Sequence, residues 1–307
     1  MAAIKRVPGI VYVLVALIMG FGWFIPGFFT VSNFLSVIRQ GSVLAVVSLG
    51  ATLAILSRGV NLSLGGVMSL AGVVTGVLMH RGWSIMAAIL VGMATATAAG
   101  WLTGIVIAGA GIAPFVVTLG MMSVGEGLAL VISGGASVPG FSNAFQVLGQ
   151  GYLLRVPIPF WIAVMAFLIV HFILRDTQLG VSIYAVGGNE DAASLSGVDV
   201  RRCKLQIYLI GGILAGVAGV VLASRMNSAH PSGGMGFEFD AIAATVVGGT
   251  PMSGGRGGVV GTMVGAAIIS IMRNGLNMLG LPTPWQMTII GMIIIGSIAL
   301  DALKSNR

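Results

Sequence analysis

The chain has 307 residues, of which 57% are hydrophobic, only 7% are charged and 48 are glycine. A soluble domain carries about 25% charged residues, so this composition excludes an ordinary globular surface and indicates many membrane-spanning helices. The net charge of +7 comes from basic residues scattered between apolar runs, which excludes the basic patch of a nucleic-acid-binding protein.

The first apolar run lies at the N-terminus and follows Lys5 and Arg6, as in a signal peptide. No pattern of small residues suited to a cleavage site follows it, because residues 21–29 are mostly aromatic and bulky. The sequence therefore predicts an uncleaved first membrane span.

The uncharged runs predict ten membrane spans, in an all-α integral membrane protein whose single domain covers residues 1–307. Residues 241–254 form the shortest of these spans and end in GGTPMSGG, so a re-entrant loop is the alternative there. The predicted spans are residues 8–29, 41–57, 63–80, 83–108, 113–133, 156–174, 205–225, 241–254, 257–274 and 283–302.

Lysine and arginine predict the orientation of the chain, because cytoplasmic loops are richer in these residues. Ten spans with a cytoplasmic N-terminus place ten basic residues inside and five outside. If residues 241–254 formed a re-entrant loop, eight basic residues would lie inside and seven outside. Ten spans with both termini in the cytoplasm are therefore preferred. The five outward basic residues are Arg39, Arg81, Arg155, Arg225 and Arg273.

The segments expected outside the membrane include one short element. Residues 30–41 carry two candidate caps, Thr30 and Ser32, and one apolar face. This pattern predicts either a helix lying at the membrane interface or an extension of the second span. The longest external segments are expected at residues 134–155 and 226–240, the second of which ends with Glu238 and Asp240.

Residues 175–204 hold eight charged residues and form the longest expected cytoplasmic loop. Within it, Asn189 is a good helix cap, acidic residues fill the following turn, and Gly197 can end the helix. The pattern predicts a two-turn helix, with an ordinary connecting loop as the alternative. A helix this short needs a packing partner, and small residues expected to be exposed would admit one: Ala192, Ala193 and Ser196.

The sequence AVGGNEDAASLSGVDV (residues 185–200) resembles the cytoplasmic coupling loop of ribose-type ATP-binding-cassette (ABC) permeases, members of the branched-chain amino acid/ribose permease superfamily. Further similar stretches follow the same order along nearly the whole chain. They include SRGVNLSLGGVMSLAGVV (57–74), APFVVTLGMMSVGEGLALVISGG (113–135) and AIAATVVGGTPMSGGRGGVVGTMVGA (241–266).

The resemblance implies the ten-helix, type II permease fold of the cobalamin importer. It also implies a second permease subunit, identical or similar, and a periplasmic binding protein that delivers a monosaccharide for import across the bacterial inner membrane. A cytoplasmic ATPase would drive import and dock on Gly187, Gly188, Asn189, Glu190, Ala192, Ala193, Ser196 and Gly197. Glu238 and Asp240, if external, could meet the binding protein.

The chain's own residues agree with a membrane subunit that uses a partner's ATPase. None of its three lysines follows a glycine, so it lacks the GxxxxGK[ST] phosphate-binding loop. No metal-ligand spacing and no catalytic arrangement of residues is present, so we expect neither an enzyme nor a cofactor in this chain.

Two segments with similar sequences are candidates for the sugar pathway, because a sugar needs hydrogen bonds but no opposing charge. Residues 59–66 and 246–258 share the pattern G-x-x-[LM]-S. They offer Asn61, Ser63, Thr250 and Ser253, although tight helix packing also explains their glycines.

Glu126 is the one acidic residue predicted well inside a span, so it requires a polar cavity or a basic partner. The candidate partners are Arg81, Arg225 and Arg273; alternatively, Glu126 lies near the external end of its span. Members of the family more often carry a basic residue at position 126, and commonly aspartate where Asn61 stands.

Other functions remain open at the level of sequence. An ion-gradient-driven secondary transporter would place acidic groups at the middle of the membrane, as Glu126 does, but leaves the coupling-type segment unexplained. An ABC permease could also carry a cargo other than a sugar, such as a signalling molecule or a nucleoside.

Overall fold

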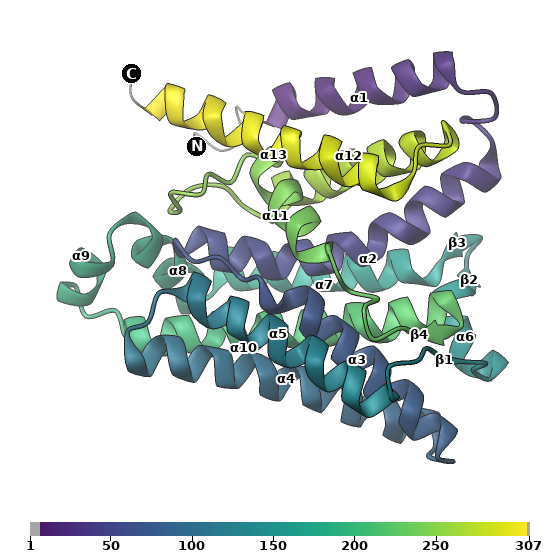
Figure 1. Cartoon of the computed structure of the whole chain (residues 1–307). Helices are drawn as coiled ribbons and strands as arrows, with labels where there is room; N and C mark the ends of the chain where they lie inside the picture. Colours follow the sequence, from purple (N-terminus) through teal and green to yellow (C-terminus); the bar gives the residue numbers. More distant parts are fainter. Residues whose placement is uncertain (1–6, 306–307) are drawn as a thin grey trace.

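The computed structural model describes residues 7–305, which form a bundle of helices packed side by side (Figure 1). Within these described residues, seven helices are long and apolar enough to cross a membrane, which confirms a helical membrane protein. They are α2 (Val31–Leu56), α3 (Ser63–His80), α4 (Ile85–Ala110), α5 (Pro114–Ser133), α7 (Ile158–Asp176), α10 (Val200–Met226) and α12 (Val259–Met278).

In the same described residues, three further helices overlap the remaining predicted spans: α1 (Val7–Phe24), α11 (Phe237–Val247) and α13 (Thr283–Ser305). The eleven residues of α11 rise about 16 Å, roughly half of a 30 Å hydrocarbon layer. The predicted span 241–254 is therefore wrong in its bounds. The helix starts earlier and ends at Val247, because Gly249 (φ +90°) and Pro251 do not continue it.

The second span begins at Val31, so residues 30–41 form no separate interfacial helix. The side chain of Thr30 caps α2 by accepting a hydrogen bond from Asn33 N at 3.3 Å. The alternative prediction, an extension of the span, is confirmed.

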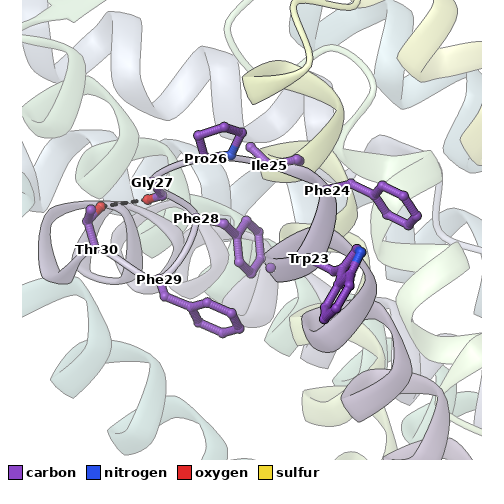
Figure 2. Close-up of a pocket in the computed structure, with 9 residues that line it drawn as sticks. Trp23, Phe24, Ile25, Pro26, Gly27, Phe28, Phe29 and Thr30 are labelled. Atoms are coloured by element: carbon purple, nitrogen blue, oxygen red, sulfur yellow. Dashed lines mark hydrogen bonds between the residues drawn. The ribbon is translucent and has the colours of Figure 1, made fainter.

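The turn before α2 forms an open aromatic pocket of about 450 Å³ between residues 22 and 30 (Figure 2). Gly27 takes a φ of +80°, and Thr30 Oγ1 donates to its carbonyl at 2.8 Å. Trp23 and Phe24 are largely exposed, which suits side chains at a membrane–water interface.

Helix α10 is, with α3, the most buried of the long helices in the described part of the chain, and it packs against α2, α3 and α4. Glycines allow this close packing. A Cβ added at Gly212 of α10 would lie 2.5 Å from the carbonyl oxygen of Ala96, and one at Gly72 of α3 would lie 3.1 Å from that of Gly219. Small residues at helix crossings are typical of membrane bundles.

The two ends of the bundle carry different short elements (Figure 1). One end has α6 (Asn143–Gln150) and the strands β1 (Val138–Pro139), β2 (Tyr152–Leu153), β3 (Val156–Pro157) and β4 (Ser228–Ala229). Strand β1 pairs with β4 and β2 with β3, so the two segments expected outside the membrane meet at this end.

The opposite end carries α8 (Gln178–Gly188) and α9 (Glu190–Leu195). The charged segment 175–204, expected to be a loop with one short helix, is thus mostly helical. Helix α8 was not predicted from the sequence.

Candidate functional site

Helix α9 has the structure that its sequence predicts. Asn189 accepts a hydrogen bond from Ala192 N at 3.0 Å, and Glu190 and Asp191 occupy the first turn. Gly197 follows the helix with a φ of +86°, a conformation that favours glycine.

Six of the eight residues expected to dock on an ATPase are exposed: Gly188, Asn189, Glu190, Ala192, Ser196 and Gly197. The expected exposure of Ala193 is wrong, because this side of α9 is turned inward and Ala193 packs into the core. Gly187 is also buried, within its own chain.

Leu195 is a feature of α9 that was not predicted from the sequence. Its side chain is 91% exposed, the largest exposed fraction among the large hydrophobic side chains that the structure describes. Leu195 lies two residues after the buried Ala193, and two residues turn a helix by about 200°. The helical period could therefore have placed Leu195 on the outer face.

Glu190 also has a partner within the chain. Its Oε1 lies 2.6 Å from the Nζ of Lys204 on α10. Glu190 is half exposed, so this pair contributes less than about 1 kcal/mol. It nevertheless orients α9 against the start of α10.

Asn61 and Ser63 are buried at the start of α3 and bond to each other. The Oδ1 of Asn61 accepts from Ser63 N at 3.1 Å and from Ser63 Oγ at 2.7 Å. These bonds shape the turn into α3, which follows the non-helical residues 59–62. The Nδ2 of Asn61 faces α10, 3.0 Å from where a Cβ on Gly211 would lie.

Thr250 and Ser253 lie in the loop between α11 and α12. Thr250 is fully buried, and its Oγ1 accepts from Gly258 N at 3.3 Å. Ser253 is exposed, and its carbonyl accepts from Arg58 Nε at 2.8 Å. The two similar segments thus lie together. Arg58, just before the first segment, bonds to the second, and Leu62 belongs to the same apolar cluster as Val246.

Glu126 is half-buried in α5 and makes no ion pair with the residues that the structure describes. None of its three candidate basic partners pairs with it. Its neighbour Gly125 instead packs against Gly66 of α3, one residue from Gly65, which contacts Glu238 in the first turn of α11.

Glu238 and Asp240 are buried inside the bundle, so their expected place in an external loop is wrong. Glu238 accepts from Gly236 N at 3.0 Å, while its Oε2 is buried against Gly65 without a hydrogen-bond partner among the described residues. The chain turns into the bundle here, where Gly234 N donates to Ser69 Oγ at 2.8 Å. Asp240 pairs with Arg273.

A crossing of α5 with α3 holds Glu126 in place. A Cβ on Gly125 would lie 2.7 Å from the carbonyl carbon of Gly66, whereas one on Gly127 would meet nothing within 4 Å. We expect Gly125→Ala to lower the free energy of unfolding by about 1–2 kcal/mol, and Gly127→Ala to leave it unchanged or raise it slightly. Unfolding in detergent measures both, and equal effects would contradict the crossing.

No cluster of three or more metal-ligating side chains occurs in the part of the chain that the structure describes. Four polar residues lie instead on or just before the elements that meet near the start of α3, which are α3, α5 and α11. They are Asn61, Ser63, Glu126 and Glu238.

Comparisons with known proteins assign the chain to a class. The family model described as "Branched-chain amino acid transport system / permease component" matches residues 33–298. A ribose import permease protein from Bacillus subtilis (strain 168) is 39% identical over 282 residues, which cover 91% of this chain and 88% of the relative.

Two other relatives match over more of the chain. A D-allose transport system permease protein from Escherichia coli (strain K12) is 37% identical over 299 residues, 97% of this chain and 92% of the relative. An L-arabinose ABC transporter permease protein from Azospirillum brasilense is 34% identical over 299 residues, 97% of this chain and 88% of the relative. No solved structure matches the chain.

Proposed function

The chain belongs to the family of permease components of branched-chain amino acid transport systems, and from that premise we propose that it is the membrane subunit of an ATP-driven sugar importer. It is a multi-pass protein of the bacterial inner membrane. Relatives named for ribose, allose and arabinose support a monosaccharide as the cargo. An ATPase and a periplasmic binding protein are its partners.

We infer one permease domain with ten crossings, type II architecture and both termini in the cytoplasm. Seven long helices supply seven crossings, and α1 and α13 supply two more. Residues 228–255 form the tenth crossing, which is only partly helical. They run from β4 at one end of the bundle to Gly255 at the other, where Gly255 N donates to the carbonyl of Leu56 near α8.

Helix α9 is the ATPase-docking element in this proposal, and Leu195 is the observation that supports it most directly. A two-turn helix is unstable alone, and α9 buries only one side against its own chain. Its outer side presents an apolar side chain among small and polar residues. That surface fits a shallow apolar cleft in a partner protein.

The pathway is proposed to pass the start of α3, bordered by Asn61, Ser63, Glu126, Thr250 and Ser253. Non-helical backbone at membrane depth is tolerated where it is buried or lines a cavity, and residues 57–62 and 248–258 are both non-helical. Helix α5, which carries Glu126, is the least buried of the seven long helices. A second permease copy, or a similar permease, would cover α5 and close the pathway.

Leu195→Ala is expected to weaken binding of the ATPase about tenfold or more, because burying a leucine contributes about 1.5–3 kcal/mol. The matched control is Leu154→Ala, which removes a leucine that is 79% exposed at the opposite end of the bundle. Titrating purified ATPase against each variant in nanodiscs measures the affinity. Equal affinities for the two variants would exclude Leu195 as an anchor.

Reconstitution tests the function itself. The chain, its ATPase and its binding protein are placed in proteoliposomes, and uptake and ATP hydrolysis are measured with ribose, allose and arabinose. Uptake that requires ATP and rises with one of these sugars supports the proposal. Uptake that persists without the ATPase and follows an ion gradient would establish a secondary transporter instead, and ATP-dependent uptake of a nucleoside alone would exclude the sugar.

A further inference from the structure

Arg58 lies in the short stretch between α2 and α3 and joins two segments that are far apart in the sequence. Its Nε donates to the carbonyl of Ser253 at 2.8 Å, and its Nη2 donates to the carbonyl of Gly188 at 2.7 Å. Gly188 is the last residue of α8 and directly precedes the Asn189 cap of α9. The guanidinium therefore bridges the proposed ATPase-docking element and the loop that carries Thr250.

The backbones of these segments are also in direct contact. Gly255 N donates to the carbonyl of Leu56 at 2.9 Å. A Cβ on Gly187 would lie against that same carbonyl oxygen and 2.6 Å from Gly255 N, so this position has no room for a side chain. We call residues 56–58, 187–188 and 253–255 the three-segment junction.

The backbone of Arg58 has a strained conformation, and the hydrogen bonds of its side chain offset the cost of this strain. Its φ is +61°, in the left-handed region that disfavours residues with a Cβ. The last carbonyls of a helix lack partners within that helix and attract a positive charge. The guanidinium of Arg58 supplies both the positive charge and a hydrogen-bond donor at the end of α8. Its Nε also holds the loop 248–258 through the carbonyl of Ser253.

We propose that Arg58 is a positioning residue that makes α8, α9 and the loop 248–258 move as one unit. This inference rests on the proposed function, in which the ATPase moves α9. The loop continues directly from α11, whose Val246 belongs to the same apolar cluster as Leu62 at the start of α3. A displacement of α9 thus reaches the residues proposed to border the pathway through contacts within one chain.

Arg58→Gly removes both guanidinium bonds and relieves the backbone strain, so this variant is expected to fold. Arg155→Gly is the matched control. Arg155 also has a left-handed φ, +64°, but its side chain makes no hydrogen bond to any group that the structure describes. Arg58→Lys is a partial rescue, because an ammonium keeps the charge but lacks the fork that reaches two carbonyls.

Two measurements test the proposal. In the full chain alone, amide exchange of residues 252–257 should become about fivefold faster in Arg58→Gly and stay unchanged in Arg155→Gly. In proteoliposomes with the ATPase and binding protein, Arg58→Gly should hydrolyse several-fold more ATP per sugar imported, with Arg58→Lys intermediate. Affinity for the ATPase should not change, since Arg58 acts within its own chain.

The results separate this inference from the proposed function. If the wild-type complex imports sugar but Arg58→Gly hydrolyses the same ATP per sugar as Arg155→Gly, the positioning role is overturned. Equal amide exchange in these two variants also overturns it. If the wild-type complex imports no sugar with ATP, the proposed function fails, while the exchange measurement still decides whether Arg58 holds the junction.

Discussion

Arg273→Gln should lower the free energy of unfolding by about 3 kcal/mol and loosen α11 from α12. The Nη2 of Arg273 lies 2.6 Å from Oδ2 of Asp240 and 2.8 Å from its Oδ1. The Asp240 side chain is only 6% exposed, so removing the arginine leaves a buried carboxylate without a countercharge. Breaking a buried pair from one side typically costs about 3–5 kcal/mol, and the lower figure applies because Arg273 is partly exposed.

The double variant Asp240→Asn with Arg273→Gln is the main control, because it removes both charges together and should recover most of the lost stability. Arg81→Gln is the second control, since Arg81 is exposed and makes no ion pair within residues 7–305. Chemical unfolding in detergent measures all four proteins. An Arg273→Gln variant as stable as Arg81→Gln would show that the pair does not hold α11.

The long helices could be predicted from the sequence because each depends on its own composition. An uncharged run of sufficient length must form its backbone hydrogen bonds within itself in a membrane. The prediction for α3, residues 63–80, has the bounds that the structure shows. Helix α9 was predictable for a similar reason, since Asn189, Glu190 and Gly197 define its ends locally.

Helix α11 could not be predicted in the same way, because its place depends on contacts with distant residues. Hydropathy assigns Glu238 and Asp240 to an aqueous loop. The structure instead buries Asp240 against Arg273, a residue of α12, and Glu238 against Gly65, a residue of α3. An acidic residue that is buried inside the bundle has the same appearance in the sequence as one in water.

The candidate site likewise combines residues that can be predicted from local sequence with residues whose roles depend on distant contacts. The sequence indicated Asn61 and Ser63, whose hydrogen bonds lie within one turn. It did not indicate Arg58, whose two acceptors lie 130 and 195 residues away along the chain. It also assigned Gly187 to the ATPase surface, whereas the structure places this glycine in the three-segment junction. Gly187 and Gly188 therefore have different roles despite being neighbours.

Gly187→Ala should lower the free energy of unfolding by about 3 kcal/mol, because the added Cβ would meet backbone on two sides. It would lie against the carbonyl oxygen of Leu56 and 2.6 Å from Gly255 N, the two atoms whose groups share a hydrogen bond. Overpacking typically costs about 1–3 kcal/mol, and the upper figure applies because no flexible side chain can move aside.

Gly188→Ala is the matched control, since a Cβ at this position would meet nothing within 4 Å. It should keep wild-type stability, and thermal unfolding in detergent compares the two variants. Amide exchange adds a local measurement, because only Gly187→Ala should expose the hydrogen bond from Gly255 N to Leu56. If both variants unfold alike, α8 and the loop 248–258 do not meet at Gly187. The movement of α9 would then have to reach the pathway through α10, which Lys204 joins to Glu190.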